Sequence, residues 1–90
     1  MIKEEIKIIN KHGLHARPAA QFVKIAGKFQ SEIKVIKDSL EVNGKSIMGI
    51  MMLAAEPGST IIIVVDGCDE ASAMQALKDL ITNKFYEDTR

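Results

Sequence analysis

The sequence has little of several residue types whose abundance would define a class of protein. Its 90 residues include one cysteine and no tryptophan. A lone Cys68 cannot form an intramolecular disulfide, which excludes a disulfide-stapled scaffold and is typical of a reducing compartment. We interpret Cys68 as a small residue beside a turn. Twelve basic residues are balanced by twelve acidic ones, so the positive field typical of nucleic-acid-binding proteins is missing. Nucleic acid is therefore not expected as a partner.

No apolar stretch is long enough to cross a bilayer. Apolar runs such as residues 61–65 are short, whereas a membrane-spanning helix needs about 20 apolar residues. The first residues carry charges at Lys3, Glu4 and Glu5, where a signal peptide would need an apolar segment. We therefore expect a cytoplasmic protein with no membrane insertion.

Hydrophobic periodicity predicts four strands and three helices in one domain over residues 1–90. Alternation at Ile6 and Ile8 indicates a first strand, followed by a turn at residues 10–13. Residues 33–37 and 40–42 read as a hairpin, and the β-branched residues 60–65 as a central strand. Helical spacing follows Pro18, Ser46 and Asp69, and we expect Ser46 and Asp69 to be N-caps. The first helix has an apolar stripe at Ala19, Phe22, Val23 and Ala26, and the last helix has one at Ala73, Ala76, Leu77, Leu80 and Ile81.

The order of these elements is βαββαβα, which defines an α+β fold. Each half, strand-helix-strand, requires a crossover to a parallel partner. Interleaving the two halves gives a four-stranded, mainly antiparallel sheet with three helices on one face. Residues 84–90 are expected to be a helix end that runs into a polar tail, frayed over residues 86–90.

Residues 13–20, Gly-Leu-His-Ala-Arg-Pro-Ala-Ala, place a histidine and an arginine where a loop becomes a helix. With Pro18 in the first helical turn, His15 falls near the N-cap. The amides of Ala16 and Arg17 then lack intrahelical partners at the positive end of the helix dipole, which favours a bound anion. The Arg17 guanidinium can pair with phosphate oxygens. A neutral imidazole is a nucleophile near neutral pH, so His15 is a candidate covalent phosphoryl acceptor.

A second segment, residues 43–51, reads Asn-Gly-Lys-Ser-Ile-Met-Gly-Ile-Met. Its residues 44–46, Gly-Lys-Ser, resemble the end of a P-loop, but a P-loop would need glycine where Ser39 stands, so a nucleotide site is rejected. The short helix after Ser46 is too small to bury all its large side chains, so we expect some in the core and some exposed. Flexible methionine suits a surface that meets several partners. We assign docking to Ile47, Met48 and Met51 and leave Met52 open between core packing and partner choice.

These two segments, with the order of elements over residues 2–85, resemble the HPr family, the histidine-containing phosphocarriers of the phosphoenolpyruvate-dependent phosphotransferase system. The resemblance implies an open-faced β-sandwich. It implies that His15 accepts a phosphoryl group on Nδ1 from phosphorylated Enzyme I and passes it to an EIIA-type domain, with Arg17 and the amides of Ala16 and Arg17 binding the phosphate. It further implies that HPr kinase/phosphorylase phosphorylates Ser46, which adds negative charge to the surface that Enzyme I binds. The family's metal dependence resides in Enzyme I, so neither a metal nor a cofactor is expected here, and the chain is expected to be a monomer without independent turnover.

Several readings stay open beside this one. The chain could act mainly as a regulatory module whose Ser46-phosphorylated form binds a transcription regulator or an enzyme. A metal-dependent hydrolase using His12 and His15 is a third reading, and it lacks the carboxylates such chemistry needs. His12 departs from the small polar residue more often found there in the family, and we interpret it either as a solvated turn residue or as a side chain that touches the phosphate or tunes His15. The motif serves both the sugar-transport and the nitrogen-related branch, so both kinds of EIIA acceptor remain candidates.

Overall fold

A computed structural model describes residues 1–86, and of Tyr86 the backbone alone. Along the chain the elements are β1 (Ile2–Lys7), α1 (Ala16–Ala26), β2 (Glu32–Lys37), β3 (Leu40–Asn43), α2 (Ile47–Met52), β4 (Thr60–Asp66), α3 (Glu70–Thr82) and the short 3-10 helix η1 (Lys84–Tyr86). The predicted order βαββαβα is confirmed. Pro18 is the third residue of α1, within the first turn as predicted, and Gly27 is the C-cap of this helix.

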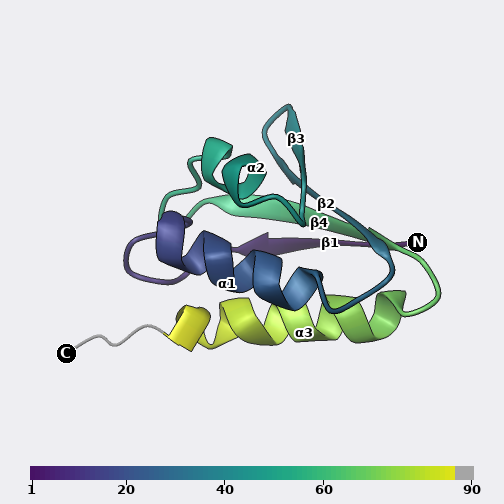
Figure 1. The fold of residues 1–90 in the computed structure, drawn as a ribbon. Coiled ribbons are helices and arrows are strands. Elements are labelled where there is room, and N and C mark those ends of the chain that lie inside the picture. Colours follow the sequence, from purple (N-terminus) through teal and green to yellow (C-terminus); the bar gives the residue numbers. More distant parts are fainter. Residues whose placement is uncertain (87–90) are drawn as a thin grey trace.

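The four strands form one sheet in the order β1-β4-β2-β3 (Figure 1). Each neighbouring pair is antiparallel. β1 and β2 run in the same direction with β4 between them, so the crossover through α1 links two parallel strands that are not adjacent. β4 is the central strand that the β-branched run predicted, because it pairs with β1 on one side and with β2 on the other.

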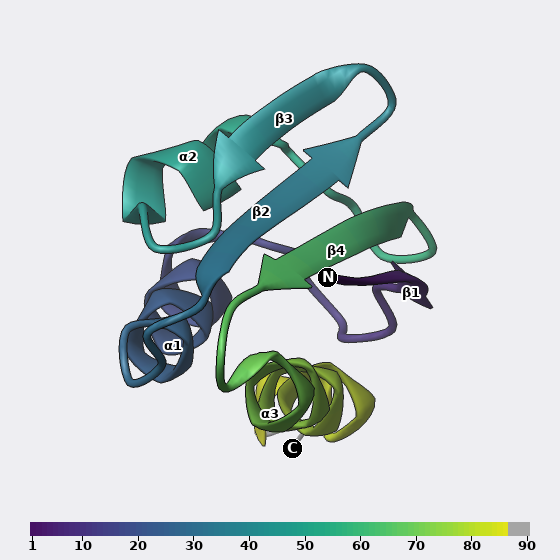
Figure 2. The same ribbon diagram turned by 90° about the vertical axis from the view of Figure 1, so that its right-hand side faces the viewer.

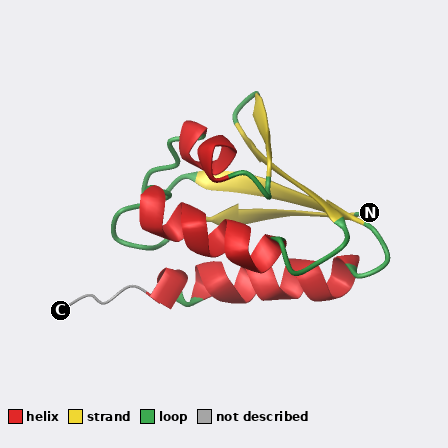
Figure 3. Ribbon diagram, in the orientation of Figure 1, coloured by secondary structure: helices red, strands yellow, loops and turns green. Residues whose placement is uncertain are grey.

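The helices all lie on one face of the sheet and leave the other face open (Figures 2 and 3). Phe22 of α1 and Leu77 of α3 are fully buried, as are Ile61, Ile63 and Val65, the inward side chains of β4. Alternate positions of β4, Ile62 and Val64, are only half-buried, because they point to the open face. The predicted α+β fold with helices on one face is therefore confirmed.

Asp69 occupies the N-cap of α3, as predicted, but its side chain does not cap the helix. The carboxylate instead accepts hydrogen bonds from the backbone amides of Gln30 (2.8 Å) and Ser31 (2.9 Å), and a short one from the Ser31 hydroxyl. Asp69 thus ties the start of α3 to the loop between α1 and β2. Glu70 reaches back to the amide of Gly67 at 3.1 Å and supplies the local hydrogen bond at this helix start.

Phe85, the residue just before the predicted frayed tail, is held in place by the fold. This side chain is completely buried and belongs to the hydrophobic core. Lys84 and Phe85 have positive φ angles of 55° and 56°, which reverse the chain after α3 and return the ring to the core. Of the tail predicted to fray, residues 87–90 lie outside the described part of the chain.

The contacts of Asp69 lead to a pH-dependent stability. Its hydrogen bond from Ser31, together with the amide of Gln30, lowers the pKa of the carboxyl below its ordinary value. A carboxyl with a lowered pKa in the folded state stabilises the fold above the unfolded-state pKa and loses that contribution as the pH falls through the folded-state pKa. We therefore expect Asp69→Asn to lower the urea midpoint at pH 7, and the difference from wild type to shrink below about pH 4.

The control for this measurement is Asp38→Asn on the exposed β2–β3 turn, where asparagine also tolerates the positive φ. This variant should keep the wild-type midpoint at pH 7. A midpoint difference for Asp69→Asn that stays constant from pH 7 to pH 3 would show that the ionised carboxylate is not what stabilises this junction.

Candidate functional site

The loop that precedes α1 is held against the loop that precedes β4 by backbone hydrogen bonds. The amide of Ile8 donates to the carbonyl of Ser59 at 2.8 Å, and the amide of Gly58 donates to the carbonyl of Ile8 at 2.7 Å. Further along, the amide of Leu14 donates to the carbonyl of Ala55 at 2.9 Å. The Leu14 side chain is buried in the core. The start of α1 is therefore fixed to a segment about 40 residues later in the chain.

Gly13 makes this close approach possible. Its φ angle is +69°, and a Cβ at this position would lie 2.3 Å from the carbonyl oxygen of Ala55. The buried side chain of Asn10 donates to the Gly13 carbonyl at 2.8 Å. Any other residue at Gly13 would strain the backbone and push the two loops apart, so the glycine before His15 is a requirement of the site's geometry.

His15 is the N-cap of α1, as the position of Pro18 predicts. It has extended backbone angles, and its side chain makes no capping hydrogen bond. The first helical hydrogen bond runs from the amide of Ala19 to the His15 carbonyl at 2.9 Å. Helix geometry leaves the amides of Ala16 and Arg17 without intrahelical partners, and Pro18 has no amide hydrogen. His15, Ala16 and Arg17 are all exposed, so an exposed imidazole stands beside two free donors at the positive end of a helix.

A shallow depression surrounds this helix start. It is lined by residues from three segments, His12, Leu14, His15, Met51, Ala54, Ala55, Glu56 and Pro57. The chain leaves α2 through Ala54, whose φ of 50° turns the following residues toward the depression. His12 is exposed, in line with a turn residue, and its ring meets that of His15 edge-on, with centroids 5.6 Å apart at 79°. The sequence paired the two histidines as a rejected metal site, and it left open that His12 touches the phosphate or tunes His15.

Ser46 caps α2, as predicted, because its hydroxyl accepts a hydrogen bond from the amide of Gly49 at 3.0 Å. The expectation that some of the four large residues belong to the core is wrong. Ile47, Met48, Met51 and Met52 are 43%, 74%, 43% and 65% exposed, and Ile50 is the buried residue of this helix. A single buried position anchors the short helix, so its other faces stay in solvent. Of the predicted docking residues, Met51 reaches the depression at His15, whereas Ser46, Ile47 and Met48 do not line it.

A charge asymmetry around α1 escaped the sequence reasoning. Residues 11–31 contain no aspartate or glutamate. Lys11, Arg17, Lys24 and Lys28 are all exposed there. Lys24 and Lys28 line a second depression between α1 and α3, together with Gln21, Ile25 and Leu80. The signal was present in the sequence as basic residues four and seven apart on one side of a helix, but the balanced overall charge concealed it.

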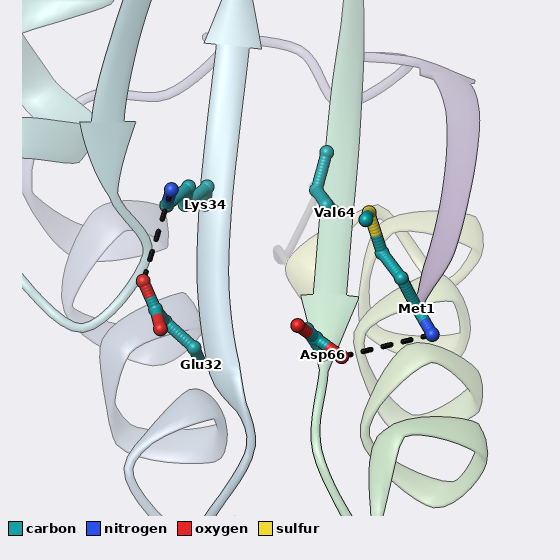
Figure 4. A pocket seen from close by; sticks show the side chains of 5 residues that line it. All are labelled: Met1, Glu32, Lys34, Val64 and Asp66. Carbon is teal, nitrogen blue, oxygen red and sulfur yellow. Dashed lines mark ion pairs between the residues drawn. The ribbon is translucent and has the colours of Figure 1, made fainter.

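The open face of the sheet has its own pocket, shown in Figure 4. It is lined by Met1, Glu32, Lys34, Val64 and Asp66. The Lys34 ammonium pairs with Glu32 at 3.7 Å, and the Met1 amine pairs with Asp66 at 3.7 Å. The Met1 amine also contacts Glu70 at 3.1 Å, and this hydrogen bond is the main cause that raises the pKa of the amine. No predicted site residue lies in this pocket, and its charges are matched with one another.

Two structural features limit the classes of site that the described residues can form. Within residues 1–86 no three side chains of the His, Cys, Asp and Glu type gather in a group that could hold a metal ion. The pair His12 and His15 alone falls short of the ligand set of a zinc site. No helix in the same part of the chain is long and apolar enough to span a membrane.

Comparison with known proteins agrees with the fold. A family model described as the phosphorylation site of the PTS HPr component matches residues 2–83. Phosphocarrier protein HPr of Neisseria meningitidis is 55% identical over 87 residues, which cover 97% of this chain and 98% of that protein.

Two solved structures from Thermoanaerobacter tengcongensis are also similar. A crystal structure described as HPr-C-His is 52% identical, covers 98% of this chain and 99% of its own, and has a TM-score of 0.94. A crystal structure described as an HPr dimer is 53% identical, covers 97% of this chain and all of its own, and has a TM-score of 0.78. The chain belongs to the HPr family, the phosphocarrier proteins of the phosphotransferase system.

Proposed function

We propose that the chain accepts a phosphoryl group on His15 from phosphorylated Enzyme I and passes it to an EIIA-type domain. One observation carries this proposal: the His15 imidazole is exposed at the N-cap of α1, makes no capping hydrogen bond, and lies beside the free amides of Ala16 and Arg17. A nucleophilic nitrogen and an anion-binding helix start therefore occupy one place.

The transfer itself needs little from the protein beyond placement and charge. The lone pair of a His15 ring nitrogen attacks phosphorus, and the bond between phosphorus and the donor breaks as the new bond to nitrogen forms. The added group carries a charge near −2, which the amides of Ala16 and Arg17 and the Arg17 guanidinium stabilise. A phosphoramidate remains reactive enough to be passed on, whereas a serine ester is stable. His15 therefore suits a carrier better than a serine would.

We infer that Ile47, Met48 and Met51 form a docking surface for both partners. Their exposure on α2 leaves apolar area that a partner can cover, and Met51 reaches the depression at His15. The basic residues around α1 favour an acidic partner surface. A carrier must leave each partner quickly, which suits a small contact and a monomeric chain.

Ser46 regulation follows from its place beside this surface. Its hydroxyl caps α2 directly before Ile47. A phosphate at this position would add a charge near −2 at the edge of the apolar docking surface. That charge would oppose an acidic partner and require desolvation on docking. HPr kinase/phosphorylase is the kinase that the family implies. The alternative role, as a regulatory module acting mainly through phosphorylated Ser46, is disfavoured by the His15 site, which a purely regulatory module would not need.

The carrier role is tested by intact mass after incubation with phosphoenolpyruvate and the cognate Enzyme I. Wild type should gain one acid-labile phosphoryl group, and His15→Ala should gain none. Ser46→Ala should gain it as wild type does, which excludes the serine as the acceptor. A wild type that gains nothing from its cognate Enzyme I would overturn the proposal and favour the regulatory role.

The docking surface is tested with Met48→Gln, which replaces an exposed apolar side chain by a polar one of similar helix propensity. We expect the KM of Enzyme I for the variant to rise roughly threefold to tenfold, since part of a methionine's burial energy is lost, while kcat stays near that of wild type. Leu40→Gln, on the exposed β2–β3 hairpin, is the matched control and should leave both constants unchanged. Equal KM values for Met48→Gln and wild type would remove Met48 from the surface.

The effect of charge at Ser46 is separated from its capping role by two variants. Aspartate and asparagine are both good N-caps, so each should preserve α2. We expect Ser46→Asp to raise the KM of Enzyme I roughly tenfold, the equivalent of about 1.4 kcal/mol, and Ser46→Asn to leave it close to wild type. An equal loss in the two variants would mean that the serine hydroxyl itself, and not the added charge, matters for docking.

A further inference from the structure

His12 and His15 present two imidazoles to the same depression. Their rings meet edge-on with centroids 5.6 Å apart, and both rings line the hollow beside the start of α1. The backbone around His12 is held by the bond from Asn10 to Gly13 and by the bond from Leu14 to Ala55. The proximity of the two rings is therefore set by a fixed loop.

The backbone at the helix start supplies fewer donors than a phosphoryl group can use. A phosphoryl group has three strongly accepting oxygens. The backbone at this helix start offers the amides of Ala16 and Arg17, while Pro18, the third helical residue, offers none. The Arg17 guanidinium is an additional donor, but Arg17 does not line the depression. On the side of the depression, His12 lies against the His15 ring and lines the hollow with it.

The other groups around this position favour His12 as the donor. Glu56 lines the depression, and its carboxylate can only repel a phosphate. Lys11 is exposed on the same turn but does not line the depression, and Arg17 belongs to the helix start. A neutral imidazole carries one N–H donor, and hydrogen bonds to an ionised acceptor are among the stronger ones.

We propose that His12 is a binding residue for the phosphoryl group: its imidazole donates a hydrogen bond to the group on His15 and thereby favours the phosphorylated form of the protein. This inference rests on the proposed function, because it requires phosphoryl acceptance at His15. It adds one side chain to the phosphate-binding groups, which are the two amides and Arg17. Residue 12 then affects the equilibrium between the phosphorylated and unphosphorylated forms, rather than the chemistry of transfer.

A competition between wild type and His12 variants measures this equilibrium directly. Wild type and one variant are mixed in equal amounts with catalytic Enzyme I and limiting phosphoenolpyruvate at pH 8, where imidazole is in general neutral. Enzyme I exchanges the group between the two proteins until equilibrium, and intact mass gives the phosphorylated fraction of each. His12→Phe keeps an aromatic ring without an N–H, and His12→Gln keeps an N–H without the ring.

We expect the phosphoryl group to favour wild type over His12→Phe by roughly fivefold, the usual net contribution of one intramolecular hydrogen bond. His12→Gln should stay within about twofold of wild type. An equal partition between wild type and His12→Phe would overturn the inference, and so would an equal loss in both variants, which would indicate ring packing instead of a donor.

The test separates this inference from the function on which it rests. If wild type takes up a phosphoryl group but shares it equally with His12→Phe, only the role of His12 fails. If wild type takes up none, both fail. Because His12 is exposed, all variants should fold, and unchanged urea midpoints would show that the partition reports the bound phosphoryl group.

Discussion

Burial of the inward face of β4 is the interaction on which the rest of the structure depends. Ile61, Ile63 and Val65 are fully buried beneath the helices, and burial of side chains of this size commonly contributes about 1.5–3 kcal/mol each. β4 also supplies the backbone partners of both β1 and β2, so without it β1 would have no partner in the sheet. The segment just before β4 then holds the loop of Gly13 and Leu14 in place. The position of the candidate site is thus fixed by hydrogen bonds to the segment that leads into the central strand.

Much of this arrangement could be predicted from the sequence because its signals are local. Pro18 indicates where α1 begins, which places His15 at the N-cap, and Ser46 caps α2 through an amide three residues away. The sheet order follows from two strand-helix-strand units that must interleave. The family resemblance rests on the same two segments, and the similar proteins confirm it. Features that depend on neighbours along the chain were therefore accessible.

Apart from the basic residues around α1, the features that the sequence did not predict depend on contacts between distant segments. Asp69 looks like any N-cap, and only the folded chain brings it to Gln30 and Ser31, almost 40 residues away. Phe85 follows a helix end and precedes polar residues, so its burial depends on a backbone reversal that no local signal announces. Which side chains of α2 are exposed could not be predicted, because the burial of Ile50 depends on how the helix packs on the rest of the protein. The ring contact of His12 likewise depends on the shape of a loop that is fixed from outside.

The N-cap of α1 has a consequence for the lifetime of the protein. His15 leaves the start of its helix without the side-chain hydrogen bond that usually contributes about 1 kcal/mol. A dianion on His15 would accept hydrogen bonds from the free amides at this helix start. By thermodynamic linkage, the free energy with which the helix stabilises the phosphoryl group also raises the free energy of unfolding of the phosphorylated protein. The loaded carrier would then open less often than the empty one and would be cut more slowly by proteases that attack opened chains. In a cell that runs short of phosphoryl donor, the total amount of the carrier would thus fall together with its phosphorylated fraction.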